Sequence, residues 1–386
     1  MSFKKWWPCP KKHTKRVRHL LPHAKRLHAN LNSARPFRYF TLCGPPMIDV
    51  FMLAKEGVLA YDELHHAIDT VVFCEYDDED VPVMRELVGR EDSGFQGKLE
   101  DLVLFEDDAF TSQFPDVQAI ENFINTKEES LSQEDRDVLQ QKINQLELQR
   151  FFPFDFINLD FCDAYYPKPP NIMKVNQAVA RILEWQGRIR PEAKPKKLGK
   201  VDEFVMAITC RLDDALPQEA ATRLVNIVKS NCDKFPVYRR GVADTRHAKV
   251  EEWAKAANLD FFLAGWPKDV AQRANEKQWS MEILDYVHYT RKNEDNQTYE
   301  MICLVCGFKR TRLTTGYLEL AMKALDKNQR IRIDSVNLEA DGGRTLMENL
   351  TAIVELRNLH AKLISREILP NPVEAIREFT AQGIEY

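Results

Sequence analysis

Hydrophobic residues form a near-continuous run in the stretch PFDFINLDFCDAYY, residues 153–166. A run of this kind is typical of a parallel strand that helices cover on both faces. Polar side chains gather toward its end, at Asn158, Asp160 and Asp163. Because ligands of open α/β sheets bind beyond the carboxyl ends of the strands, the stretch predicts a central strand with a candidate site at its tip.

Other short apolar runs predict the rest of the sheet. They are FRYFTLC (37–43), VVFCEY (71–76), GFQG (94–97) and EFVMAITC (203–210). Segments with apolar residues at helical spacing separate them, and this alternation is expected of a parallel sheet. Residues 281–290 and 299–309 are two further runs joined by a short polar turn, so they predict a β-hairpin, which is antiparallel.

The pattern divides the chain into three parts. Residues 1–36 form a basic N-terminal arm, 37–312 an α/β domain and 313–386 a mostly helical C-terminal extension. Within the domain, residues 118–150 are charged with one apolar helical face and predict an inserted helical hairpin. The expected fold class is therefore α/β, with a Rossmann-like, mostly parallel seven-stranded sheet that ends in an antiparallel hairpin.

Charge is distributed unevenly along the chain. Residues 1–48 carry eleven Lys or Arg and no acid, and since the whole chain has a net charge of −5, the remainder carries −16. Trp6 and Trp7 add stacking surfaces, so the arm is a candidate contact for nucleic acid. A solvated tail, or a segment docked on the acidic body, are the alternatives. Part of the arm is expected to be an amphipathic helix, with an apolar face made of Leu20, Leu21, Leu27 and Leu31.

The composition bears on location. No apolar run reaches the roughly 18 residues of a membrane-spanning helix, and the first residues lack the apolar core of a signal peptide. Eight cysteines are scattered along the chain, a pattern that favours reduced thiols over a disulfide framework. We therefore expect a cytoplasmic protein without a membrane partner.

The order of the predicted elements, with Gly44 after the first strand and Glu75 ending the second, resembles that of the class I S-adenosylmethionine-dependent methyltransferases. The resemblance implies that the first loop, with Cys43 and Gly44, lies under the methionine part of the cofactor. It also implies that Glu75 holds the ribose. The turn after the third strand, with Glu100 and Asp101, would flank the adenine.

The resemblance covers about residues 37–310 and includes the fourth strand, whose end carries catalytic groups in this family. Here those groups would be Asp160, Asp163 and Tyr165, with the tyrosine able to stack on a base. Together with the basic arm, the resemblance implies a transferase that methylates or binds nucleic acid. Most of the acceleration would then come from holding the acceptor in line with the methyl group.

Departures from the family pattern leave a second function open. The family's first loop is usually rich in glycine, whereas Pro45 and Pro46 follow Gly44 here and remove two N–H donors. Lys98 also stands where the family often has an acid. The alternative is a catalytically inactive scaffold, a binding or regulatory subunit whose helical insertion or C-terminal helices contact a protein partner.

The residue types are also compatible with two kinds of metal site. Glu75, Asp160 and Asp163 at strand tips are the kind of carboxylates that bind Mg²⁺ in nucleases, which makes a nuclease the third hypothesis. Cys303 and Cys306 form a C-x-x-C half-site for zinc, but no second pair of ligands follows nearby. The favoured interpretation places these cysteines on one strand without a metal.

Overall fold

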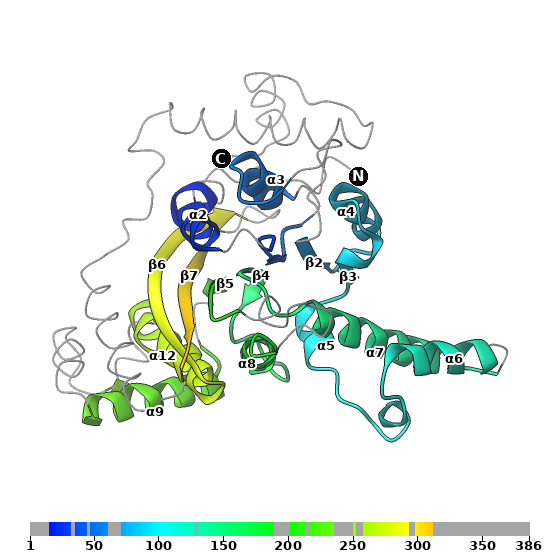
Figure 1. The fold of residues 1–386 in the computed structure, drawn as a ribbon. Helices are drawn as coiled ribbons and strands as arrows, with labels where there is room; N and C mark the ends of the chain where they lie inside the picture. The colour runs from blue at the N-terminus through cyan, green and yellow to red at the C-terminus, as the bar shows by residue number, and fades with distance from the viewer. Residues whose placement is uncertain are drawn as a thin grey trace.

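The computed structural model describes residues 15–31, 35–44, 47–60, 71–127, 130–188, 201–212, 216–234, 250–251, 258–292 and 298–311. At its centre lies a seven-stranded sheet with the order β3-β2-β1-β4-β5-β7-β6 (Figure 1). The strands are β1 (Tyr39–Thr41), β2 (Val71–Glu75), β3 (Gly94–Gln96), β4 (Phe156–Ala164), β5 (Glu203–Leu212), β6 (Trp279–Lys292) and β7 (Thr298–Arg310).

The predicted fold class is confirmed: the structure is a mostly parallel, Rossmann-like α/β sheet. Strands β1 to β5 pair in parallel, whereas β7 is antiparallel to both β5 and β6. It follows that β6 runs parallel to β1–β5 and that β7 alone, of these seven strands, is reversed. The predicted hairpin is thus present, and the structure shows that its second strand inserts between β5 and β6.

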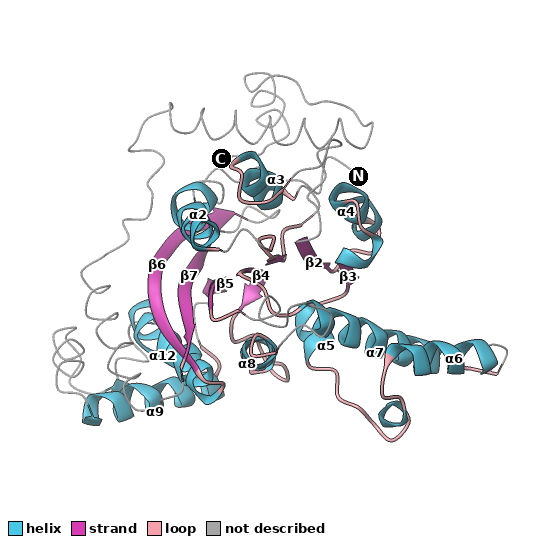
Figure 2. Ribbon diagram, viewed as in Figure 1, coloured by secondary structure: helices cyan, strands magenta, loops and turns pink. Residues whose placement is uncertain are grey.

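Helices cover both faces of the sheet (Figure 2). On one face lie η2 (Arg16–Leu20), α2 (Leu21–Asn30), α3 (Ile48–Lys55) and α4 (Asp80–Val88). On the other face lie α5 (Leu99–Val103), α8 (Lys174–Trp185), α9 (Gln218–Lys234) and α12 (Asn258–Glu276). Short 3₁₀ turns lie at Glu91–Ser93 and Thr111–Gln113.

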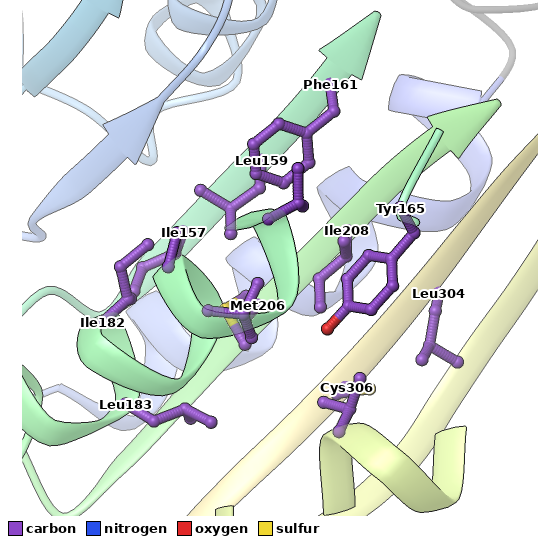
Figure 3. Close-up of a cluster of buried hydrophobic side chains, with 14 of the residues drawn as sticks. Ile157, Leu159, Phe161, Tyr165, Ile182, Leu183, Met206, Ile208, Leu304 and Cys306 are labelled. Atoms are coloured by element: carbon purple, nitrogen blue, oxygen red, sulfur yellow. The ribbon is translucent and has the colours of Figure 1, made fainter. Parts of the chain in front are cut away.

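The two cores follow from strand periodicity. Successive residues of a strand point to opposite faces, so Phe156 packs under α2–α4 and Ile157 under α8 and α12. Figure 3 shows the second core, where side chains of β4, β5 and β7 meet those of α8. Burial on both faces explains why β4 reads as a continuous apolar run rather than an alternating one.

The predicted helical insertion is confirmed. Helices α6 (Val117–Lys127) and α7 (Gln133–Phe151) extend away from the sheet (Figure 1). They enclose a small apolar cluster of their own, which contains Phe114, Ile120, Leu139 and Ile143. Ser132 caps α7, because its hydroxyl accepts a hydrogen bond from the backbone N–H of Asp135 at 3.1 Å.

The last part of the domain contains one helix that the sequence did not predict. A helix was expected near 250–258; residues 250 and 251 are helical, and 252–257 lie outside the described residues. The helix α12, which occupies Asn258–Glu276, was not predicted. Pro267 lies inside α12, although proline in a sequence normally marks a helix end. The expected helical extension at 313–386 lies outside the described residues.

Replacing Gly94 with alanine is expected to lower the free energy of unfolding by roughly 2–3 kcal/mol, the upper range for overpacking a core. A Cβ at this position in β3 would lie 2.3 Å from Cζ of the buried Phe73 in β2. Urea denaturation measures the change, with Gln96→Ala as a control at an exposed position of the same strand. Equal stabilities of the two variants would contradict the prediction.

Candidate functional site

The candidate site lies at the carboxyl edge of the parallel strands, where β1 and β4 are neighbours. The chain leaves β1 toward β2 on one side and continues from β4 to β5 on the other, so this is the point where strand order reverses. Ligands of open α/β sheets bind at such a point. Thr41, the last residue of β1, is opposite Asn158 of β4 in the register.

Asp49 of α3 joins the two strands at this point. Its Oδ2 accepts hydrogen bonds from the Tyr39 hydroxyl at 2.5 Å, the Thr41 hydroxyl at 2.7 Å and Nδ2 of Asn158 at 2.9 Å. Asp49 is 1% exposed. The burial of Tyr39, together with the charge of Asp49, raises the pKa of the Tyr39 hydroxyl well above the usual range. Sequence reasoning missed Asp49, although a single acid inside the apolar stretch MIDVFML was a usable signal.

Cys43 and Gly44 follow β1 as predicted. Burial raises the pKa of the Cys43 thiol, and the charges of Asp49 and Glu75 raise it further, so the thiol is protonated rather than nucleophilic. Gly44 has a φ of +65°, and a Cβ built on it would meet no described atom within 4 Å. No described atom therefore occupies the space where a side chain of residue 44 would begin, while Pro45 and Pro46 lie outside the described residues.

Glu75 ends β2 at the same edge. Its Oε1 accepts hydrogen bonds from the backbone N–H groups of Tyr76 at 2.7 Å and Asp77 at 3.2 Å. Burial raises the pKa of Glu75, and these two hydrogen bonds oppose the rise. Tyr76 is 70% exposed, and the ammonium of Lys98 lies 5.3 Å from its ring centroid. The residue that follows Glu75 is therefore an exposed aromatic side chain, which sequence reasoning overlooked.

Glu100 and Asp101 lie in the first turn of α5 and differ in their surroundings. Burial raises the pKa of Glu100. Asp101 forms an ion pair with Lys174 of α8. The turn that leads to them is held beside β2, because the N–H of Gly97 donates to the Glu75 carbonyl at 2.9 Å.

Asp160 meets a lysine from the N-terminal arm. Asp160 is opposite Thr209 of β5 in the register. The ammonium of Lys15 donates to the Thr209 hydroxyl at 2.9 Å and lies 3.7 Å from Oδ2 of Asp160. Both charged side chains are buried, at 0% and 4% exposed, so the tips of β4 and β5 hold a buried ion pair that the sequence did not predict.

Beyond Asp160 the strand bulges. The register shifts between Asp160 and Ala164, a device that re-aims side chains at strand ends. Tyr165 then turns into the core beneath the sheet (Figure 3), where it is 1% exposed and its hydroxyl accepts a 3.4 Å hydrogen bond from Asn176. Tyr165 is therefore a packing residue in this structure, and the expected stacking on a base does not fit its position. The side chain of Asp163 lies outside the described residues.

The described part of the arm docks on the acidic body, which was one of the alternatives. Leu20, Leu21 and Leu27 are buried against the sheet, as the amphipathic pattern predicted. The arm's basic groups pair with body acids: His19 with Asp285 at 2.6 Å, Lys25 with Glu56 at 2.5 Å and Arg26 with Glu203 at 3.7 Å. Residues 1–14, with both tryptophans, lie outside the described residues.

The metal hypotheses find little support in the described ranges. Cys303 and Cys306 are three places apart on β7 and pack in different cores, on opposite faces of the sheet, so they do not form a half-site for zinc. In the part of the chain that the structure describes, no three His, Cys, Asp or Glu side chains cluster as metal ligands. Glu75 and Asp160 therefore form no metal cluster with described residues.

No helix among the described residues combines the length and apolarity needed to cross a membrane. A scan against models of known protein families finds no match, and a search of curated protein sequences finds none either.

Proposed function

We propose that this chain binds S-adenosylmethionine, or a closely related nucleoside, at the carboxyl edge of β1 and β2. The observation that carries the proposal is the half-buried Glu75 at the tip of β2, one strand away from the open backbone of Gly44. A carboxylate in this place accepts both hydroxyls of a ribose in related α/β folds. The uncovered glycine allows a ligand to lie against the main chain.

Tyr76 and Lys98 support a nucleoside rather than a simple sugar. The Tyr76 ring is largely exposed and immediately follows Glu75, which suits stacking on a purine whose ribose the carboxylate holds. Lys98, near that ring, supplies positive charge beside the proposed base. The remaining predicted contacts are Cys43 under the ligand and Glu100 near the base.

Methyl transfer to nucleic acid is the activity we propose for the bound cofactor. The methyl group would leave the sulfonium sulfur as a new bond forms to an acceptor atom, and S-adenosylhomocysteine would be the product. Asp160 at the tip of β4 is the catalytic group that we propose, while Asp163 stays a prediction. Incorporation of labelled methyl groups into DNA or RNA tests this step.

A second candidate function is a binding subunit without catalysis. It is favoured by Lys15, whose buried ammonium engages Asp160 and Thr209, at the strand tips where catalytic groups were expected. In that case the chain transfers no methyl group, whether or not it binds the cofactor. Absence of methyl incorporation, despite measurable cofactor binding, would favour this candidate.

Glu75→Ala is expected to weaken binding of S-adenosylhomocysteine by roughly tenfold or more, because hydrogen bonds to a charged group each contribute about 1.5–3 kcal/mol. Calorimetric titration of the full chain measures the dissociation constant. Asp78→Ala is the matched control, since Asp78 carries the same charge on the same turn but is exposed. Equal affinities in the two variants would remove Glu75 from the site.

The same titration should depend on pH. Burial raises the pKa of Glu75 above its ordinary value of 4.5, and the ionised carboxylate is the form that accepts two hydroxyl hydrogen bonds. Affinity should therefore be full above the raised pKa and fall as the pH drops through it. The Glu75→Gln variant should lose this step, and a midpoint at or below 4.5 would contradict the prediction.

A further inference from the structure

A polar groove lies between α8, α9 and α12. It has a volume of about 910 Å³, and its lining side chains come from one side of α9, from α12 and from the start of α8. These helices cover the sheet face opposite α2, α3 and α4 (Figure 1). A hollow of this volume is in the range of small-molecule sites.

The groove is cationic on a protein whose net charge is negative. Among the described residues that line it, Arg223, Lys268 and Arg273 are cations and Glu219, which is exposed, is the acid. The chain as a whole carries −5. A concave, positively charged surface concentrates anions from solution.

A buried carboxylate beneath the groove holds the guanidinium groups in place. Asp269 is 0% exposed, and its Oδ1 accepts hydrogen bonds from Nε and Nη2 of Arg223 at 2.9 and 2.5 Å. Nε of Arg273 lies 3.6 Å from the same oxygen. One carboxylate therefore orients two guanidinium groups and neutralises one positive charge of the two.

The other lining groups define the chemistry of the ligand. Most are amides and hydroxyls, and the apolar members are Met173 and Ile227. None of the described lining residues is aromatic, so the described part of the lining offers no stacking surface for a base. Asn275 adds a buried Oδ1 that accepts no hydrogen bond from a described residue and suits a ligand hydroxyl.

We propose that this groove binds a small, hydroxylated anion that carries phosphate. Planar guanidinium groups match phosphate oxygens in geometry and charge, and the surrounding amides supply hydrogen bonds to a sugar-like body. This site is separate from the proposed cofactor site, and it stands whether or not the chain binds S-adenosylmethionine.

Calorimetric titration of the full chain with ribose 5-phosphate and with pyrophosphate tests the proposal. We expect saturable binding of one phosphate compound per chain at constant ionic strength. Tighter binding of ribose 5-phosphate would identify the ester as the ligand, and tighter binding of pyrophosphate would identify the free anion. If neither probe shows saturable binding, the proposal is overturned.

Two variants locate the binding. Asn226→Asp places a negative charge in the groove at an exposed position and should weaken binding roughly tenfold through like-charge repulsion. Arg273→Gln removes a lining cation and should also weaken it. Asn122→Asp on α6 makes the same charge change outside the groove and should leave affinity unchanged.

Equal losses in Asn226→Asp and Asn122→Asp would overturn the assignment, because they would show a general charge effect. A single-stranded oligonucleotide serves as competitor. Displacement of the small anion by the oligonucleotide, with loss of oligonucleotide binding in Asn226→Asp, would make the groove a nucleic-acid contact instead. An oligonucleotide that does not displace the small anion would support the proposal of a small-anion site.

Discussion

Replacing Lys15 with methionine is expected to lower the free energy of unfolding by about 3–5 kcal/mol, the cost typical of removing one partner from a buried ion pair. The Lys15 side chain is 0% exposed and lies 3.7 Å from Asp160, with a 2.9 Å hydrogen bond to Thr209. Methionine preserves most of the volume, so the loss reports charge and hydrogen bonding. Urea denaturation at neutral pH measures it.

Lys25→Met is the control from the same arm. Lys25 pairs with Glu56, but the two side chains are 48% and 37% exposed, and exposed pairs contribute about 0–1 kcal/mol. A second substitution, Asp160→Asn, should recover part of the stability lost in Lys15→Met, because the two charges are coupled. If Lys15→Met and Lys25→Met lowered the free energy of unfolding by similar amounts, the buried ion pair would contribute no more stability than the exposed one.

The Lys15 variant also bears on the proposed function. If Lys15 holds the arm over the tips of β4 and β5, its loss should speed amide hydrogen exchange in α2. A catalytic role of Asp160 predicts altered methyl transfer in the same variant. Unchanged exchange in α2 would show that Leu20, Leu21 and Leu27 hold the arm without the lysine.

The second large effect is expected at Asp269. Asp269→Asn keeps the shape but removes a carboxylate that accepts hydrogen bonds from Arg223, Asn176 and the Tyr166 hydroxyl. The guanidinium groups of Arg223 and Arg273 would then have no carboxylate between them. We expect the free energy of unfolding to fall by about 3 kcal/mol. The value lies at the lower end of that range because the Arg223 side chain is 33% exposed.

Asp101→Asn provides the comparison for Asp269. Asp101 also pairs with a cation, Lys174, but both side chains are more than a third exposed, so the loss should stay within about 1 kcal/mol. Thermal or urea denaturation separates the two cases. If Asp269→Asn were as stable as Asp101→Asn, the guanidinium groups would not depend on Asp269 for their position.

Local patterns alone determined the elements of the sheet. The apolar runs at 71–76 and 203–210 became β2 and β5, and the two runs after residue 280 became β6 and β7. The periods of strands and helices are set by residues close together in the sequence, so these elements can be predicted without knowing the distant contacts. The same period already indicates that Cys303 and Cys306, three places apart on one strand, face opposite sides.

The tertiary structure alone decided which polar groups meet. Lys15 and Thr209 are 194 positions apart, and Tyr166 and Asp269 are 103 apart, so no local signal pairs them. A register shift in β4 likewise turned Tyr165 into the core. A single sequence shows where an acid or a lysine is, whereas the partner that offsets its desolvation is set by how the elements pack.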